Sequence, residues 1–159
     1  MSSWHRIRAA WGSAILVATA LLWGGCGGGD DPIDVEPDPA IAPFVGNWTA
    51  LAMVVTSVAN PDVSPDLIEE GATFSLNVQA SGQYTANLIF LQQVSTEIGF
   101  ISVSGSTVTL KREFPSPSTS TATYEFQGSL LTLDGPTEFD FNLDGEPEAA
   151  EGHIELQRS

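Results

Sequence analysis

Hydrophobic and polar residues alternate along most of the chain between residues 43 and 158. Phe74, Leu76 and Val78 are separated by single polar residues, and the same period of two resumes at Tyr84. This period places successive side chains on opposite faces of a strand, so that one face can pack while the other meets solvent. The pattern predicts strands over 46–58, 74–78, 84–90, 98–104, 106–113, 119–127, 130–133, 138–143 and 153–157.

The segments between these strands are short and rich in turn-forming residues. Gly105 and Gly128-Ser129 join neighbouring strands, and Asp134-Gly135-Pro136 predicts a further turn. One stretch, 64–70, has the pattern of a short helical turn, with proline near its start and Gly71 as its stop. About eight short strands joined by tight turns favour an all-β, up-and-down antiparallel meander, and closing it into a barrel removes its exposed edges.

The beginning of the chain has a different pattern. Arg6 and Arg8 precede an uncharged apolar run over 9–23, and two glycines then lead to Cys26, the only cysteine. This order is typical of a secretory signal. With a cysteine directly after the small residues, it resembles a bacterial lipoprotein signal, which implies cleavage after residue 25, lipidation of Cys26 and a membrane anchor. The alternative, a retained membrane-spanning helix, needs roughly 20 apolar residues, more than this run offers.

An acidic segment rich in glycine and proline, over 26–42, separates the signal from the strands. Glycine makes such a segment flexible, whereas charge and proline extend it, so we expect a tether. The predicted organisation is a signal peptide at 1–25, the tether at 26–42 and a barrel domain at 43–159. Acidic residues behind Cys26 also resemble the surface-export signals of some Gram-negative lipoproteins; a plain spacer is the alternative. We expect a secreted, lipid-anchored protein at the outer membrane or cell surface of a Gram-negative bacterium.

The net charge of the chain limits the classes of molecule that it can bind. The chain carries 20 acidic and 5 basic residues, for a net charge of −15. Without Arg6 and Arg8 of the signal, three basic residues face the twenty acidic ones, for a net charge of −17. Such a surface repels phosphate groups, so we expect no nucleic-acid partner. The basic pair Lys111-Arg112 is interpreted as a solvated strand end, or as a contact for an acidic partner; the sequence names no protein partner.

Several short motifs resemble a known family. The stretch 43–48 contains the Gly-x-Trp with which lipocalin-like domains open, and Gly82-Gln83-Tyr84 resembles the second hairpin of small bacterial lipocalin-like lipoproteins. The stretches 102–110 and 124–130 resemble their later hairpins. The resemblance covers residues 43–158 and implies an up-and-down β-barrel whose apolar interior can hold a small hydrophobic molecule.

The same resemblance implies a contact at one end of the barrel. In lipocalins, the tryptophan of Gly-x-Trp closes one barrel end, and an arginine after the last strand lies across its ring. Trp48 and Arg158 are the matching residues of this chain. The alternative is a frayed C-terminus, because Arg158 is the penultimate residue.

The strand period also predicts which side chains face the interior. The candidates to line a ligand site are Phe74, Leu76, Tyr84, Leu88, Phe90, Phe100, Tyr124, Phe126, Phe139 and Phe141. A barrel of about eight strands can be filled by its side chains or can hold one small ligand. The many aromatic residues favour a filled interior. The function expected is a lipid-anchored lipocalin-like protein that can bind a small hydrophobic ligand, and the alternative is a surface interaction module with a filled barrel.

One motif carries metal-binding chemistry. The residues from Asp140 to Gly145, followed by Glu151, match the spacing D-x-[DN]-x-[DN]-G-x5-E of a calcium loop. Asp140, Asn142, Asp144 and Glu151 would supply the oxygen ligands. The flanking residues are predicted strands rather than helices, so the alternative is a solvated acidic hairpin. Calcium is the one cofactor that the sequence indicates, and it would stabilise the interaction module.

The sequence offers little evidence of a catalytic site. His153 is the one histidine after the signal, so a zinc site lacks its nitrogen ligands. A serine hydrolase would also need a Gly-x-Ser-x-Gly elbow, which the sequence does not contain. Carboxylate pairs are expected by chance among twenty acidic residues. We therefore expect no enzymatic activity, and we interpret His153 as an exposed strand residue.

Overall fold

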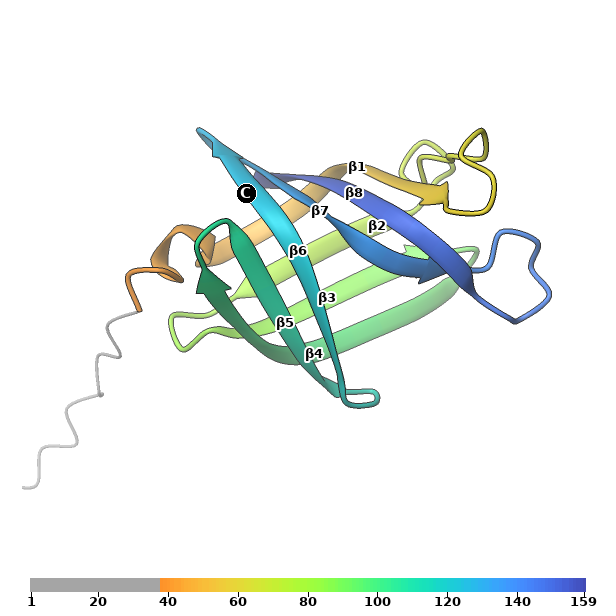
Figure 1. Ribbon diagram of the computed structural model, residues 1–159. Coiled ribbons are helices and arrows are strands. Elements are labelled where there is room, and N and C mark those ends of the chain that lie inside the picture. The colour runs from red at the N-terminus through yellow and green to blue at the C-terminus, as the bar shows by residue number, and fades with distance from the viewer. Residues whose placement is uncertain (1–37) are drawn as a thin grey trace, which may run out of the picture. The chain divides into compact units, whose positions relative to one another are not determined.

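Residues 38–159 form a closed antiparallel barrel of eight strands in a computed structural model, which describes this part of the chain (Figure 1). The predicted signal, Cys26 and the tether up to residue 37 lie outside the described residues. Among the described residues, no helix is both long enough and apolar enough to span a bilayer.

The strands follow one another around the barrel in sequence order. Each pairs with the next, and the last pairs with the first to close the wall. The elements are the 3-10 turn η1 (Ala42–Phe44), β1 (Gly46–Ser57), β2 (Thr73–Val78), β3 (Gln83–Phe90), β4 (Gln93–Ser104), β5 (Thr107–Phe114), β6 (Ser118–Gln127), β7 (Leu130–Phe139) and β8 (Glu148–Arg158). The all-β, up-and-down barrel predicted from the alternating pattern is confirmed.

The stretch 64–70 is not a helix, which corrects a sequence-based prediction. It contains hydrogen-bonded turns inside the long β1–β2 connection. The Asp66 carboxylate accepts the backbone N–H of Met53 at 3.0 Å and that of Ile68 at 2.9 Å. These bonds tie the connection to β1, and Leu67 is buried to 2% exposure beneath it. Tertiary contacts with β1 therefore override the local helical signal.

The predicted turn at Asp134-Gly135-Pro136 is also wrong, because these residues lie inside β7. The predicted strands 130–133 and 138–143 are one strand that ends at Phe139. Gly135 is needed for close packing: a Cβ atom there would lie 2.6 Å from the carbonyl oxygen of Thr121. Here the glycine allows the close approach of a neighbouring strand, and the proline lies at a strand edge; neither forms a turn.

The buried side chains form two clusters at opposite ends of the barrel. The first, here called the closed-end cluster, has Phe44, Trp48, Ala50, Leu76, Val78, Tyr84, Ala86, Ile101, Val108, Leu131 and Leu156 as its buried members. The second, here called the loop-end cluster, has Val55, Leu67 and Ala72, with Met53, Leu88, Phe90, Phe139 and Phe141 packed against them. Strands β1, β3 and β7 contribute to both clusters, so their middle sections cross the space between the two.

The predicted contact between Trp48 and Arg158 is confirmed. The guanidinium carbon of Arg158 lies 4.4 Å from the centroid of the Trp48 ring. The same guanidinium donates hydrogen bonds to the backbone carbonyls of Pro43 and Val45. The indole Nε1–H donates to the carbonyl of Phe44 at 2.8 Å. Arg158 thus joins the end of β8 to the segment before β1, and the C-terminus is held rather than frayed.

The Arg158→Ala substitution is expected to lower the free energy of unfolding by about 1–2 kcal/mol. It removes a cation–π contact and two hydrogen bonds to carbonyl groups that remain in the protein. Urea unfolding followed by circular dichroism measures the change. Gln157→Ala is the comparison at the neighbouring position: it loses a side-chain hydrogen bond to Ser129 but no aromatic contact, so a smaller loss is expected. Equal stability of Arg158→Ala and the wild type would show that the contact adds nothing.

Candidate functional site

A cavity of about 750 Å³ lies inside the barrel. Leu76, Tyr84 and Ala86 of the closed-end cluster and Val55 and Leu67 of the loop-end cluster all line it, so it lies between the two clusters. Most of its other lining side chains are apolar as well: Met53, Val54, Phe74, Leu88, Leu110, Ala122, Leu133, Pro136, Phe139, Ala149 and Ile154. The expectation of an interior filled by aromatic side chains is therefore corrected.

Several aromatic side chains lie at the ends of the barrel, whereas Phe74, Tyr84 and Phe139 line this space. Tyr124 and Phe126 pack edge-on against Phe44, with ring centroids 4.9 and 5.0 Å away. Phe139 and Phe141 pack against each other at 5.0 Å near the other end. Rings that stack on one another at the ends do not extend into the middle of the interior.

The structure distributes the predicted lining residues over five places. Phe74, Leu76, Tyr84, Leu88 and Phe139 line the cavity. Phe90 lies with Leu88 and Phe139 beside a second hollow of about 350 Å³. The remaining side chains lie in the closed-end cluster (Tyr124 and Phe126), in the loop-end cluster (Phe141) and on the outer surface (Phe100).

Phe100 points outward and is 39% exposed, which corrects its predicted place in the interior. Its neighbours Gly99 and Ile101 are buried, so the inward-facing positions of β4 are the odd-numbered ones. β4 carries apolar residues on both faces here. The large Phe100 ring therefore suggested the wrong inward face.

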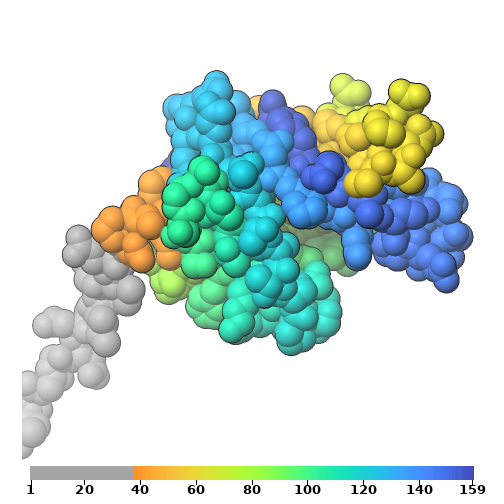
Figure 2. Space-filling model, viewed as in Figure 1, coloured from red at the N-terminus to blue at the C-terminus, as the bar shows by residue number. Residues whose placement is uncertain are grey.

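The barrel wall opens between β6 and β7. Their pairing runs from Gln127 opposite Leu130 to Thr123 opposite Asp134 and stops there. Beyond this point residues 118–122 pair only with β5, and residues 135–139 pair only with β8. Figure 2 shows the surface hollowed between the cyan atoms of β6 and the blue atoms of β7 and β8. Residues of both edges line the cavity, so this slot connects it with the outside.

The edge of the slot tolerates a proline. Alternate residues of a strand direct their backbone groups to opposite neighbours. The N–H of Arg158 bonds the carbonyl of Ser129, so the odd-numbered residues of β7 bond toward β8. Pro136 therefore directs its backbone toward the slot, where a missing N–H costs no pairing.

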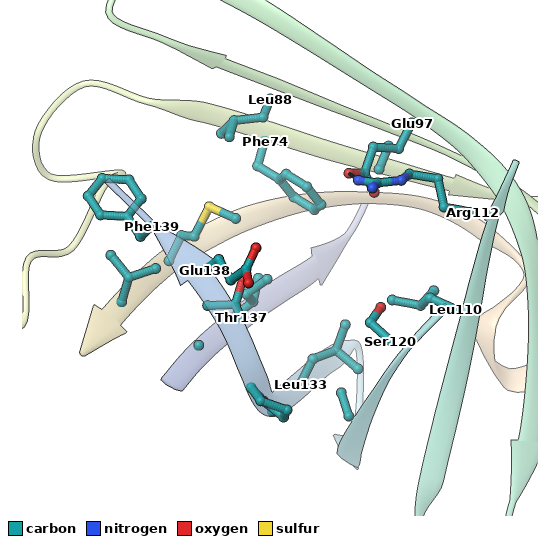
Figure 3. A pocket seen from close by; sticks show the side chains of 18 of the residues that line it. Phe74, Leu88, Glu97, Leu110, Arg112, Ser120, Leu133, Thr137, Glu138 and Phe139 are labelled. Carbon is teal, nitrogen blue, oxygen red and sulfur yellow. Dashed lines mark hydrogen bonds and ion pairs between the residues drawn. The ribbon is translucent and has the colours of Figure 1, made fainter. Parts of the chain in front are cut away.

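The lining also has a polar part, formed by an ion pair and by Ser95, Ser118, Thr119, Ser120, Thr121, Thr137 and Glu138. The Nη1 atom of Arg112 lies 2.6 Å from Oε1 of Glu97, and its Nε–H donates to the carbonyl of Ser116 at 2.9 Å. Figure 3 shows both side chains directed into the cavity, close to the Phe74 ring. Their side chains are 28% and 38% exposed, so the pair is accessible from the cavity. The interpretation of Arg112 as a solvated strand end is corrected, although its neighbour Lys111 is exposed.

Tyr84 adds a phenolic hydroxyl to the polar part of the lining. The residue is 2% exposed, and burial, followed by the negative charge of Glu97, raises the pKa of its hydroxyl. That hydroxyl makes no hydrogen bond within the described part of the chain, and no fully buried side-chain polar atom there lacks a partner. The Tyr84 hydroxyl therefore opens onto the cavity.

A β-bulge directly follows Arg112, which faces inward with Val108 and Leu110. Ile98 pairs with Phe114, whereas the next residue, Gly99, pairs with Arg112, so Glu113 is an extra residue in β5. A bulge bends its strand and re-aims the side chains beside it. The sequence analysis missed both Glu97 and Arg112. Adjacent residues of a strand face opposite sides, so one member of the pair Lys111-Arg112 had to face inward.

The predicted calcium ligands do not converge. Asp140, Asn142 and Asp144 lie in the β7–β8 connection, whereas Glu151 lies within β8, opposite Thr56 and Pro136. Glu151 is three residues beyond the start of β8 at Glu148, roughly 10 Å along the strand. Within residues 38–159, no three His, Cys, Asp or Glu side chains are arranged to hold a metal ion.

The β7–β8 connection is instead held by its own hydrogen bonds. The Asp140 carboxylate accepts the N–H groups of Asp144 and Gly145, at 3.1 and 2.7 Å. Glu148 accepts the N–H of Phe141 and the side-chain amide of Asn142, both at 3.0 Å. Backbone and amide donors thus occupy oxygens of two carboxylates in this loop.

His153 lies on the outside of the barrel, as expected. Its Nδ1 is 2.6 Å from a carboxylate oxygen of Asp134, and its Nε2 is 3.6 Å from Glu155. The hydrogen bond to Asp134 is the main reason that the pKa of His153 is raised above its ordinary value of 6.5. The imidazole lies outside the cavity and has no role in the candidate site.

The pKa of His153, measured by NMR, is expected to lie above 6.5 and to fall toward that value in Asp134→Asn. A raised pKa means that the folded state favours the protonated ring. Its stabilisation is complete below about pH 6.5 and is lost as the pH rises through the raised pKa. Because the side chain is 41% exposed, the effect on stability is a few tenths of a kcal/mol. An unchanged pKa in Asp134→Asn would show that this contact is not the cause.

No family model matches the chain, and comparisons with curated proteins and with solved structures found no similar protein. The functional argument therefore starts from the barrel and its cavity.

Proposed function

We propose that this protein binds a small, largely apolar molecule inside its barrel. The observation that supports the proposal is the cavity of about 750 Å³ with a predominantly apolar lining. Pockets for small molecules typically measure about 300–1,000 Å³ and carry a few polar groups among apolar ones. When an apolar ligand removes the side chains that face such a space from water, the free energy of the system falls.

The slot between β6 and β7 supplies a route for the ligand. It opens through the side of the barrel beyond the close contact of Gly135 with Thr121 and Ala122, between residues 118–120 and 136–139. Residues 118–120 are serine, threonine and serine, so this edge carries short side chains. The ends of the barrel offer less access, because clusters of apolar side chains occupy both.

We also propose that the barrel is a lipocalin-like domain held at the cell envelope by a lipid on Cys26. The strand order and the Arg158 guanidinium over Trp48 support the lipocalin-like part. The order of charged, apolar and small residues before Cys26 supports the anchor. A tethered domain near a membrane is well placed to take up a molecule that water dissolves poorly.

Titration with the uncharged dye Nile red tests binding in the cavity. The wild-type protein is expected to give saturable, blue-shifted fluorescence that excess decanol displaces. Ala122→Phe fills part of the cavity and is expected to weaken dye binding about tenfold or more. Thr123→Phe, at the neighbouring exposed position, is the matched control and should bind as the wild type does. Equal binding by both variants, or no saturable binding by the wild type, would refute the proposal.

A further inference from the structure

We infer that the ligand is an uncharged amphiphile: an apolar body with a hydroxyl-type head that lies against Glu97, Arg112 and Tyr84. This inference rests on the proposed function, because it specifies the ligand of the same cavity. Glu97 and Arg112 line the cavity together with apolar side chains such as Phe74 and Leu110 (Figure 3), and Tyr84 lines the same cavity. One end of the ligand can therefore form hydrogen bonds while the rest contacts hydrocarbon.

The ion pair leaves both a donor and an acceptor for the ligand. Arg112 uses Nη1 for Glu97 and Nε for Ser116, so its Nη2 group is available for an acceptor. Glu97 uses Oε1 for Arg112, so its Oε2 is available for a donor. The Tyr84 hydroxyl, which opens onto the cavity, can donate or accept. A hydroxyl can donate to Glu97 and accept from Arg112 or Tyr84 at the same time.

The charge of the lining disfavours an anionic head. The positive charge of Arg112 is matched at 2.6 Å by Glu97, so it is not free to neutralise a ligand carboxylate. Glu138 also lines the cavity and adds a second negative charge. An incoming carboxylate would lose water and meet one cation and two carboxylates, inside a chain of net charge −15. The cavity therefore favours an uncharged head over the carboxylate of a free fatty acid.

A cationic head and a plain hydrocarbon are also poorer ligands. An ammonium group would have to share Glu97 with Arg112, and the two cations would repel each other. A hydrocarbon would displace water from the exposed part of the ion pair without offering hydrogen bonds in return. Leaving such charged groups without hydrogen-bond partners is costly. An uncharged hydroxyl avoids both penalties.

Four ligands of one chain length test the inference: decanol, decanoate, decylamine and decane, each competing against Nile red. In the wild-type protein, decanol is expected to bind about tenfold more tightly than each of the others, because a hydrogen bond to a charged group is worth about that factor. Decanoate binding as tightly as decanol would overturn the inference and leave the proposed function intact. If none of the four displaces the dye, both fail.

Glu97→Gln sharpens the test, because it keeps the size of the side chain and removes its charge. Arg112 then becomes an unmatched cation, so decanoate is expected to gain about tenfold or more and to overtake decanol. Glu125→Gln, an exposed position on β6, is the control and should keep the wild-type order. Arg112→Gln gives an independent readout, because decylamine should gain through the free Glu97. A wild-type ligand order in both Glu97→Gln and Arg112→Gln would overturn the inference.

Discussion

The Gly99→Ala protein is expected to lose about 3 kcal/mol of unfolding free energy, the upper part of the range for forcing atoms into a packed site. A Cβ atom at this position would lie 2.1 Å from the carbonyl oxygen of Lys111 and 2.8 Å from the Cα of Arg112. Both obstacles are backbone atoms, which cannot move away as the end of a side chain can. Relief requires β4 and β5 to separate next to the bulge that follows Arg112.

Gly152→Ala is the matched control for this prediction. Gly152 also lies in a strand, but its Cβ would first meet the Cγ2 methyl group of Thr137, at 3.3 Å. A methyl group can yield by a few tenths of an ångström, so we expect a change below about 1 kcal/mol. Urea unfolding of both variants gives the comparison. Similar stability losses in both would mean that the close approach of β4 to Lys111 does not constrain the barrel.

The second large effect is expected at Trp48, where substitution by alanine should cost about 3–5 kcal/mol. The indole is 1% exposed in the closed-end cluster and has Phe126 as a neighbour, with ring centroids 6.0 Å apart. Its removal leaves a large void, the carbonyl of Phe44 without its indole donor, and Arg158 without an aromatic partner. Denaturant unfolding measures the loss.

Two further variants separate the causes of this loss. Trp48→Phe keeps a ring in the cluster but removes the indole N–H, so an intermediate loss is expected. Phe100→Ala, at an aromatic position that is 39% exposed, should cost below about 1 kcal/mol. If Trp48→Ala and Phe100→Ala were equally mild, the closed-end cluster would not be the main source of stability.

The alternating pattern predicted the barrel because each strand must present one face to the interior. It was weakest in β7, where Gly135 and Pro136 have the composition of a turn. Their roles depend on Thr121 and on the end of the β6–β7 pairing, both distant in the sequence. The prediction for the stretch 64–70 failed for a similar reason, because Asp66 bonds to Met53 of β1, which is distant in the sequence. Local signals cannot report contacts of this kind.

The candidate site was predicted only in part. Side chains such as Phe74 and Leu88 followed from the strand period, because apolar residues of one parity share a face. The size of the cavity did not follow, because it depends on the aromatic rings packing together at the two ends. The Glu97–Arg112 pair was missed as well, because charged residues are usually assigned to the surface, although both positions share the parity of buried neighbours.

A crystal structure of the protein with bromodecanol bound tests the central claim most directly. The anomalous signal of bromine locates the chain end without reference to the protein. We predict a bromine peak inside the cavity, among side chains such as Leu88 and Phe139, with the ligand hydroxyl within hydrogen-bond distance of Glu97 and Arg112. Bromine peaks on the outer surface alone, with the cavity filled only by water, would contradict the account.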